Sequence, residues 1–195
     1  MSLSIRILFL GLVLLFCTTC TIDRSILLYS AAEAETFSSF QKLPLDQQAI
    51  ITNEQEDGQS LLLGLTFVDR FNEKPLIGQE VYFYQATNQG LYEAMDPNDE
   101  STARLHQQAN TNDHGQIFVK TILPGDYGSR SDNRHIHMTI KGAQPEAYDL
   151  HFQQFANPML QKFIRGSDQH FLVDLKYTSD SLLIGFMTIQ AKFNK

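Results

Sequence analysis

Apolar and polar residues alternate in short runs from Leu61 to the C-terminal end of the chain. A period of two is typical of strands with one buried face, and Pro, Gly, Asn and Asp residues separate the runs as turn residues do. The pattern predicts seven strands: Leu61–Asp69, Gln79–Ala86, Gln116–Thr121, His135–Ile140, Tyr148–Phe155, His170–Tyr177 and Leu183–Phe193. Only Asn157–Ile164 suggests a helical turn, with Pro158 at its first position. Short strands without alternating helices predict an all-β fold, an antiparallel β-sandwich.

The first twenty residues have a different pattern. Arg6 precedes the unbroken apolar run Ile7–Cys17, which has the charge and length of a secretory signal and is too short to span a bilayer. We therefore expect residues 1–20 to be a signal peptide or lipoprotein signal, and the protein to be exported to the periplasm or cell surface. The stretch FCTTC resembles a lipobox, so Cys20 is expected to carry a lipid that attaches the protein to a membrane. Ordinary cleavage near Ala34 is the alternative.

Residues 21–60 are rich in Ala, Glu, Gln, Ser and Asp, and their apolar patches are short, as at Ala49-Ile50-Ile51. This composition predicts a tether and lead-in arm, followed by a folded domain at residues 61–195. The chain has 195 residues, 43% of them hydrophobic, which suffices for one core but not for two.

Charge and cysteine content exclude several classes of protein. The sequence has 15 Lys and Arg against 22 Asp and Glu, a formal net charge of −7, so we expect no nucleic-acid partner. Its two cysteines, Cys17 and Cys20, both lie in the predicted signal. The mature fold is therefore expected to hold neither a disulfide framework nor a thiolate metal cluster.

The candidate chemistry lies in His135 and His137. Residues i and i+2 of a strand point to the same face, so the two imidazoles should project side by side with Ile136 turned away. Such a pair suits a metal, although most such pairs are surface or hydrogen-bonded histidines. Tyr92 and Tyr127 lie upstream, and tyrosines on strands are more often part of the core.

Four motifs favour the metal interpretation. They are Tyr84-Gln85 with Gly90-Leu91-Tyr92, then Asn112-Asp113-His114-Gly115, then Thr121–Tyr127, and last Arg134–His137. In their order and most of their spacing they resemble the intradiol ring-cleavage dioxygenases, the family of protocatechuate 3,4-dioxygenase and catechol 1,2-dioxygenase. The turn-like segment Asn72–Val81 also resembles the family, so the likeness covers roughly residues 61–155.

The resemblance implies a β-sandwich of the prealbumin-like type, in which residues 61–195 are the catalytic domain. It implies a non-haem ferric ion, Fe(3+), held by Tyr92, Tyr127, His135 and His137. It also implies an enzyme that binds a catechol-type substrate and opens its ring with dioxygen between the two hydroxylated carbons, giving a muconate-type diacid. One tyrosinate acts as a base in this reaction, and we count Tyr127 as a catalytic candidate for that reason.

The sequence departs from the family at one functional position. Family members usually carry an arginine three residues before the first histidine, where this chain has Asp132. Arg130 and Arg134 are the two candidates to replace it, and strand alternation points Arg134 away from the histidine face, which favours Arg130. The sequence also predicts no long helical N-terminal region of the kind with which catechol 1,2-dioxygenases dimerise, so we expect a minimal catalytic-domain version of the family whose oligomeric state stays open.

Two alternatives accompany the dioxygenase hypothesis. The first is a non-enzymatic transthyretin-like β-sandwich that binds a partner or ligand at the cell surface and keeps the ligand residues as relics. The second is the same fold with zinc at His135 and His137. A visible colour separates them, because tyrosinate bound to ferric iron absorbs visible light, whereas zinc or an empty site does not.

Overall fold

The protein is described by a computed structural model, which covers residues 25–127 and 133–193. The expected signal, with Cys17 and Cys20, and the catalytic candidate Arg130 lie outside the described residues. Within the described part of the chain, no helix has the length and apolar character needed to cross a membrane.

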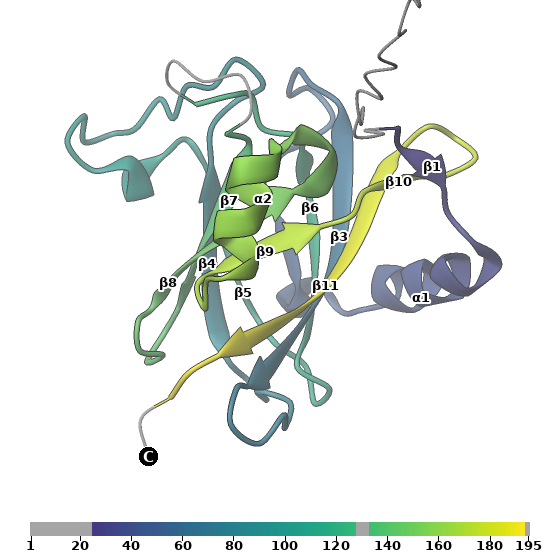
Figure 1. The fold of residues 1–195 in the computed structure, drawn as a ribbon, viewed down its shortest axis with the longest axis vertical. Helices are drawn as coiled ribbons and strands as arrows, with labels where there is room; N and C mark the ends of the chain where they lie inside the picture. Colours follow the sequence, from purple (N-terminus) through teal and green to yellow (C-terminus); the bar gives the residue numbers. More distant parts are fainter. Residues whose placement is uncertain (1–24, 128–132, 194–195) are drawn as a thin grey trace, which may run out of the picture.

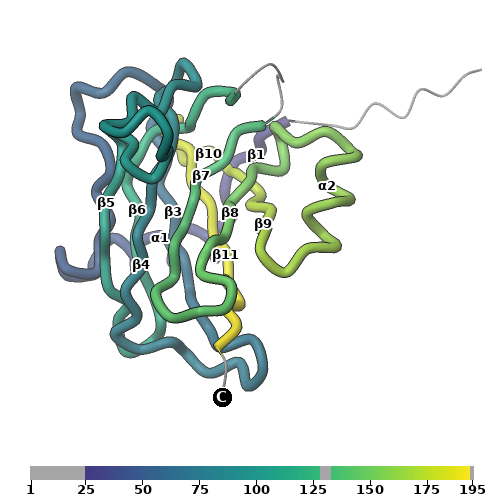
Figure 2. The backbone as a smooth tube through the Cα atoms, turned by 90° about the vertical axis from the view of Figure 1, so that its left-hand side faces the viewer, coloured from purple at the N-terminus to yellow at the C-terminus, as the bar shows by residue number. Residues whose placement is uncertain are grey.

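Two β-sheets pack face to face, which confirms the predicted all-β sandwich (Figure 1). The first sheet has six strands in the order β1-β10-β11-β3-β6-β2, with bounds Leu27–Leu28, Lys176–Tyr177, Leu183–Ala191, Ser60–Asp69, Gln116–Ile122 and Gln48–Ile50. The second has five strands in the order β5-β4-β7-β8-β9, with bounds Leu105–Asn110, Glu80–Gln85, His135–Ile140, Ala147–Phe152 and His170–Val173. Figure 2 shows the second sheet running across the view in this order.

The core lies between the sheets and follows the period-two pattern. In β4 and β7 alternate residues are buried, and Phe83, Ile136 and Met138 are almost completely enclosed. The central strand β3 is buried along most of its length, because β11 and β6 flank it and Phe40 and Phe186 lie against it at Gly64. Burial of these apolar side chains is the main favourable contribution to folding.

The sheets are mixed, whereas the sequence pattern predicts antiparallel strands. Four neighbouring pairs are parallel: β1 with β10, β2 with β6, β3 with β11, and β8 with β9. Parallel neighbours need a crossover connection, and between β8 and β9 helix α2, Pro158–Arg165, supplies it. Asn157 caps this helix and Pro158 stands at its start, as predicted.

Part of the predicted tether belongs to the fold, which corrects that expectation. Helix α1, Ala31–Gln41, begins at a capping box of Ser30 and Glu33, and strand β2 pairs with β6. Phe40 of α1 is buried against Gly64, where a Cβ atom would lie 2.6 Å from its ring. Phe37 and Phe40 are the large apolar residues of α1, and two such residues are too few to give a helical period in the sequence, so the helix was not predicted.

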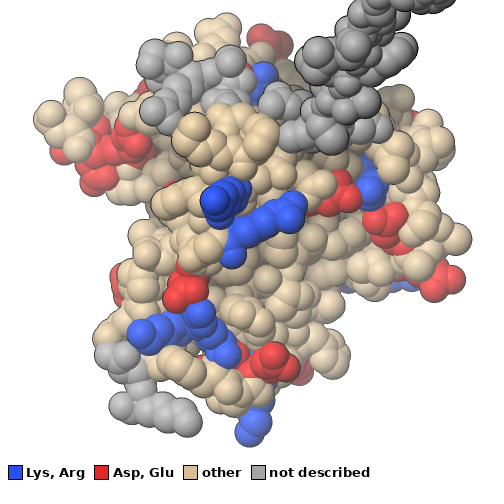
Figure 3. Space-filling view, in the orientation of Figure 1, with Lys and Arg blue, Asp and Glu red and all other residues tan. Residues whose placement is uncertain are grey.

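Two strands differ from the predicted elements. The run His170–Tyr177 forms β9 in one sheet and β10 in the other, so the chain changes sheets after Val173. Strand β5 was not predicted, because it lies at a sheet edge and buries only Leu105 and Ala109. On the face seen in Figure 3, acidic and basic side chains lie beside one another and form no continuous surface of one sign.

Candidate metal centre

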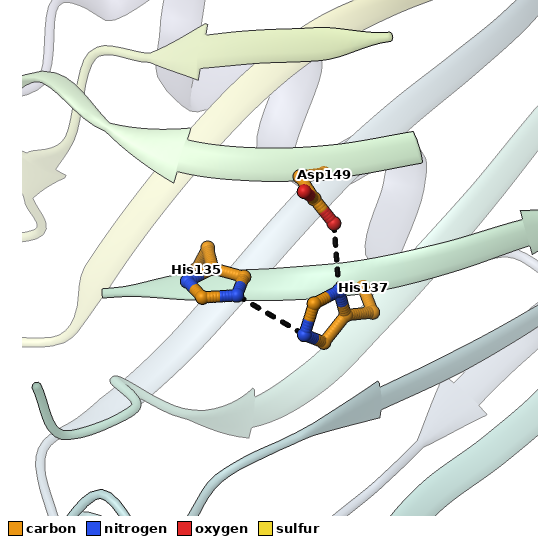
Figure 4. A group of neighbouring side chains, drawn as sticks. All are labelled: His135, His137 and Asp149. Carbon is orange, nitrogen blue, oxygen red and sulfur yellow. Dashed lines mark hydrogen bonds and ion pairs between the residues drawn. The ribbon is translucent and has the colours of Figure 1, made fainter. Parts of the chain in front are cut away.

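Strand β7 presents His135 and His137 on one side of the second sheet, as strand alternation predicts. Their Nε2 atoms lie 3.0 Å apart (Figure 4), while Ile136 between them is 1% exposed in the core. The two imidazoles therefore point at one spot outside the sheet.

The two predicted tyrosines lie at the same spot. The hydroxyl of buried Tyr92 is 2.8 Å from Nε2 of His137, and the ring of Tyr127 meets that of Tyr92 edge-on at 5.1 Å. The ring of Tyr127 is 6.4 Å from that of His135, and its hydroxyl donates to the carboxylate of Glu100. Three donor atoms thus converge, and the fourth residue lies beside them with its hydroxyl turned toward Glu100.

Close backbone contacts bring the tyrosine loops together. At Gly90, a Cβ atom would lie 2.0 Å from the carbonyl oxygen of Asp126, the residue before Tyr127. At Gly125, a Cβ atom would lie 2.4 Å from the carbonyl oxygen of Asn88, and its own amide donates to Thr87 at 2.8 Å. Only glycine permits this approach, so the glycines two residues before each tyrosine serve to bring Tyr92 and Tyr127 together.

A buried amide joins the two sheets below these loops. Gln85, at the end of β4, is completely buried and donates through Nε2 to the carbonyl of Ile122 at 3.0 Å. Thr121 Oγ1 donates to Gln85 Oε1 at 2.9 Å. Because β4 and β6 belong to different sheets, these bonds fix the origin of one tyrosine loop against that of the other.

The outer nitrogens of both histidines determine where the protons lie. His137 Nδ1 is 2.6 Å from the carboxylate of Asp149 on β8, and His135 Nδ1 is 2.9 Å from the carbonyl oxygen of Asn133. A carboxylate and a carbonyl only accept, so both Nδ1 atoms carry the proton and both Nε2 atoms present lone pairs. The lone pairs of His135 Nε2 and His137 Nε2 face each other at 3.0 Å, and the hydroxyl of Tyr92 supplies one proton to this group of three atoms. A cation bound between the atoms satisfies both lone pairs.

The protonation equilibria of the site fit a cation as well. Burial lowers the pKa of His135, helped by the neighbouring His137, so the imidazole is neutral as a ligand must be. Burial raises the pKa of Tyr92, and that of Tyr84 to about 12. A bound ion of high charge reverses this effect on a phenol that it contacts. Phenolate and imidazole are donors that suit ferric iron.

Asp149, Glu100 and Tyr84 complete the surroundings. None of the three was predicted to be a site residue, although Tyr84 belongs to one of the family motifs. Burial by itself would raise the pKa of Asp149, but the hydrogen bond and charge of the nearby histidines bring it below its ordinary value. Tyr84 stacks on His137 at 4.5 Å, because the two residues pair across β4 and β7. For Asp149, the only signal in the sequence was its position two residues before His151 on a predicted strand, which places the two side chains on the same face.

Of the two candidate arginines, only Arg134 lies among the described residues. Arg134 forms an ion pair with Asp126 at 3.4 Å and lies over the ring of Phe155 at 4.7 Å. It therefore turns away from the histidine face, as alternation predicts. His106 and His114 lie apart from the centre: His106 is on β5 beside Tyr82, and His114 is exposed in a turn.

Comparison with known proteins identifies the family of this chain. The family model Dioxygenase_C, described as Dioxygenase, matches residues 34–193. Catechol 1,2-dioxygenase of Acinetobacter baylyi is 36% identical over 73 residues, which make up 37% of this chain and 23% of that protein. The matched segment is thus less than a quarter of that curated relative.

Solved structures share the fold. An intradiol ring-cleavage dioxygenase from Tetranychus urticae superposes with a TM-score of 0.54 at 22% identity, covering 73% of this chain and 85% of that one. The dioxygenase domain of a carbohydrate-binding fusion protein from Streptomyces gives 0.54 at 20% identity, covering 78% and 93%. A catechol 1,2-dioxygenase from Acinetobacter gives 0.55 at 17% identity, covering 76% and 58%. At these identities the likeness establishes the fold, and the family model establishes the relationship. The chain belongs to the intradiol ring-cleavage dioxygenase family.

Proposed function

We propose that the protein is a non-haem ferric-iron dioxygenase that opens a catechol-type ring with dioxygen between its two hydroxylated carbons, giving a muconate-type diacid. The observation that carries the proposal is the convergence of Tyr92 Oη, His135 Nε2 and His137 Nε2 on one point, with Tyr127 beside it. These four residues would hold the iron. When bound, the ion supplies Lewis acidity that makes the chelated ring reactive toward dioxygen.

The residues around the donors have separate tasks. Asp149 accepts from His137 Nδ1 and so fixes the tautomer and ring orientation of this ligand. Asn133 does the same for His135 through its backbone carbonyl. Tyr84 stacks on His137 and excludes water from that side of the ring. Together they hold the donor atoms in place before any substrate arrives, which reduces the reorganisation that binding requires.

Tyr127 is the residue to which we assign the proton of the catechol. It is the more exposed of the two tyrosines, at 37% against 7% for Tyr92, and so the one that a substrate reaches. As a phenolate it takes up the proton of a catechol hydroxyl at Oη. The neutral hydroxyl then donates to Glu100, whose hydrogen bond raises the pKa of Tyr127 and so favours its protonated form.

A cation over the reacting ring carbon would stabilise the negative charge that develops there. Arg134 is engaged with Asp126 and Phe155, so we assign this role to Arg130, which follows the Tyr127 loop in sequence. We further propose that the protein is exported and attached to a membrane by a lipid on Cys20. Mass spectrometry of the mature N-terminus tests this part: an unmodified terminus near Glu35, or an intact Met1, contradicts it.

The central experiment combines iron content, colour and turnover in purified protein. We expect one ferric ion per chain, a visible tyrosinate band and ring cleavage of catechol, protocatechuate or hydroxyquinol. His135→Ala and His137→Ala should each lose iron and colour, whereas the matched control His114→Ala, in an exposed turn, should keep both.

Two outcomes would overturn the proposal. A fully iron-loaded His135→Ala protein contradicts the ligand assignment. A wild-type protein that binds no ferric iron and has no colour supports the non-enzymatic binding module instead.

A further inference from the structure

The geometry points to a second cation site, formed by Asp149, His151 and His170 on the outer face of the second sheet, which takes a divalent ion of the zinc class. This site is separate from the donors of the iron site and goes beyond the proposed dioxygenase activity. One ligand atom of each residue lies within 4.8 Å of the others, and the contacts of His170 Nδ1 with His151 Nε2 and Asp149 Oδ2 identify these atoms.

Sheet register places these residues on one face. Asp149 and His151 are two residues apart on β8, and Asp149 pairs directly with His170 on the parallel strand β9. On its other side, β8 pairs with β7 in a register that sets His151 opposite His135 and Asp149 opposite His137. The outer face of three adjacent strands therefore carries two neighbouring groups of metal-binding side chains that meet at Asp149.

The distances suit a tetrahedral ion. His151 Nε2 lies 3.2 Å from His170 Nδ1, and His170 Nδ1 lies 3.4 Å from Asp149 Oδ2. Ligand atoms bound to zinc at about 2.0–2.1 Å in a tetrahedron are about 3.3–3.4 Å apart. The protein thus already holds His170 Nδ1 at the spacing that the ion requires from each of the other two ligand atoms.

Hydrogen bonds among the three atoms satisfy them only in part. His170 Nδ1 faces both a carboxylate oxygen and an imidazole nitrogen, and a single ring nitrogen carries either one proton or one lone pair. A proton on His170 Nδ1 is therefore divided between two acceptors, and a lone pair there would face the lone pairs of the Asp149 carboxylate. His151 is 4% exposed and its other ring nitrogen, Nδ1, has no partner in the described part of the chain, so this imidazole is held in place without a full set of hydrogen bonds.

Asp149 can serve both groups at once. Its Oδ1 accepts from His137 Nδ1 at 2.6 Å, which leaves Oδ2 available on the side of His170. A carboxylate has lone pairs enough for both contacts.

The fourth position is open to water or another ligand, because the side chains of Asp149 and His170 are each 25% exposed. Three protein ligands with an open position are typical of catalytic and exchangeable zinc sites rather than structural ones.

Cobalt(II) titration of metal-free protein tests the site independently of the iron. The variant Tyr92→Phe/His135→Gln removes two donors of the iron site and keeps all three ligands of the second site. We expect it to bind one cobalt ion, with visible bands of a tetrahedral complex, and to release it to zinc. Adding His170→Gln should weaken cobalt binding at least about a hundredfold. Mutating a residue that only hydrogen-bonds to a metal ligand already lowers metal affinity about ten- to a hundredfold. His114→Gln, in the same background, should change nothing.

A positive control uses His170→Cys, which keeps a ligand atom at the position and should add an intense near-ultraviolet thiolate-to-cobalt band. Circular dichroism establishes that each variant is folded. The proposal is overturned if the Tyr92→Phe/His135→Gln protein binds no cobalt, if His170→Gln leaves its affinity unchanged, or if folded His170→Cys protein shows no thiolate band. None of these results bears on iron binding by wild-type protein, so the two proposals fail separately.

Discussion

Gly90→Ala should separate the two tyrosine loops, and Gly78→Ala is its matched control. Both glycines have a positive φ, 79° at Gly90 and 63° at Gly78. Alanine therefore costs about 1–2 kcal/mol at either position through its left-handed backbone. The surroundings differ: at Gly78 no atom lies within 4 Å of the new Cβ, whereas at Gly90 the carbonyl oxygen of Asp126 lies at 2.0 Å.

The size of the displacement follows from that contact. Real Cβ atoms essentially never approach a neighbour closer than 3.0 Å, so the Asp126 carbonyl must retreat by about 1 Å. Tyr127 is the next residue and moves with it, away from Tyr92. A displacement of about 1 Å at a catalytic group costs on the order of a hundredfold in rate. We therefore expect Gly90→Ala to lose about a hundredfold in ring cleavage and to shift or weaken the tyrosinate band.

Three measurements on both variants check this reasoning. Urea unfolding gives the loss of stability, which we expect to be about 1–2 kcal/mol for Gly78→Ala and larger for Gly90→Ala. Iron titration with visible spectroscopy, and ring cleavage, report on the site itself. If Gly90→Ala matches Gly78→Ala in colour and turnover, the close approach of the loops does not position the tyrosines and the argument is refuted.

Three further predictions concern single side chains. Tyr92→Phe and Tyr127→Phe should each change or bleach the visible band with little loss of stability, because the ring still packs; an unchanged spectrum in both would remove the phenols from the metal. Arg130→Ala should lower catechol turnover about a hundredfold while iron and colour persist, whereas Arg134→Ala should affect turnover less; the reverse result would mean that Arg134 serves the site. In metal-free protein, burial and the nearby His135 lower the pKa of His151 to about 3, so the unfolded chain binds a proton below about pH 6.5 that the folded chain does not. Between about pH 6.5 and about pH 3, this group therefore removes about 1.4 kcal/mol of stability for each pH unit of acidification. His151→Gln should flatten the dependence of urea-unfolding stability on pH in this window; an unchanged slope would contradict a neutral His151.

Local periodicity was enough to find most strands and the central pair of candidate ligands. Strand β7 matches its predicted bounds, and His135 and His137 share a face because side chains alternate along every strand. The start of α2 was also legible, since a capping residue followed by proline specifies a helix N-terminus locally. These features depend on neighbours within a few residues, so the sequence determines them before any tertiary contact forms.

Only the tertiary structure decided what lies beside that pair. Asp149 meets His137 because β8 pairs with β7 in one register, and His170 joins Asp149 because α2 returns the chain in parallel as β9. Tyr92 and Tyr127 approach each other through contacts at Gly90 and Gly125 between separate loops. Helix α1 is likewise held by packing against the sheet at Gly64. Strand pairing and loop contacts join segments that are far apart in the chain. The alternation of apolar and polar residues along one strand is the same whichever strand it pairs with, so it does not predict which pairing forms.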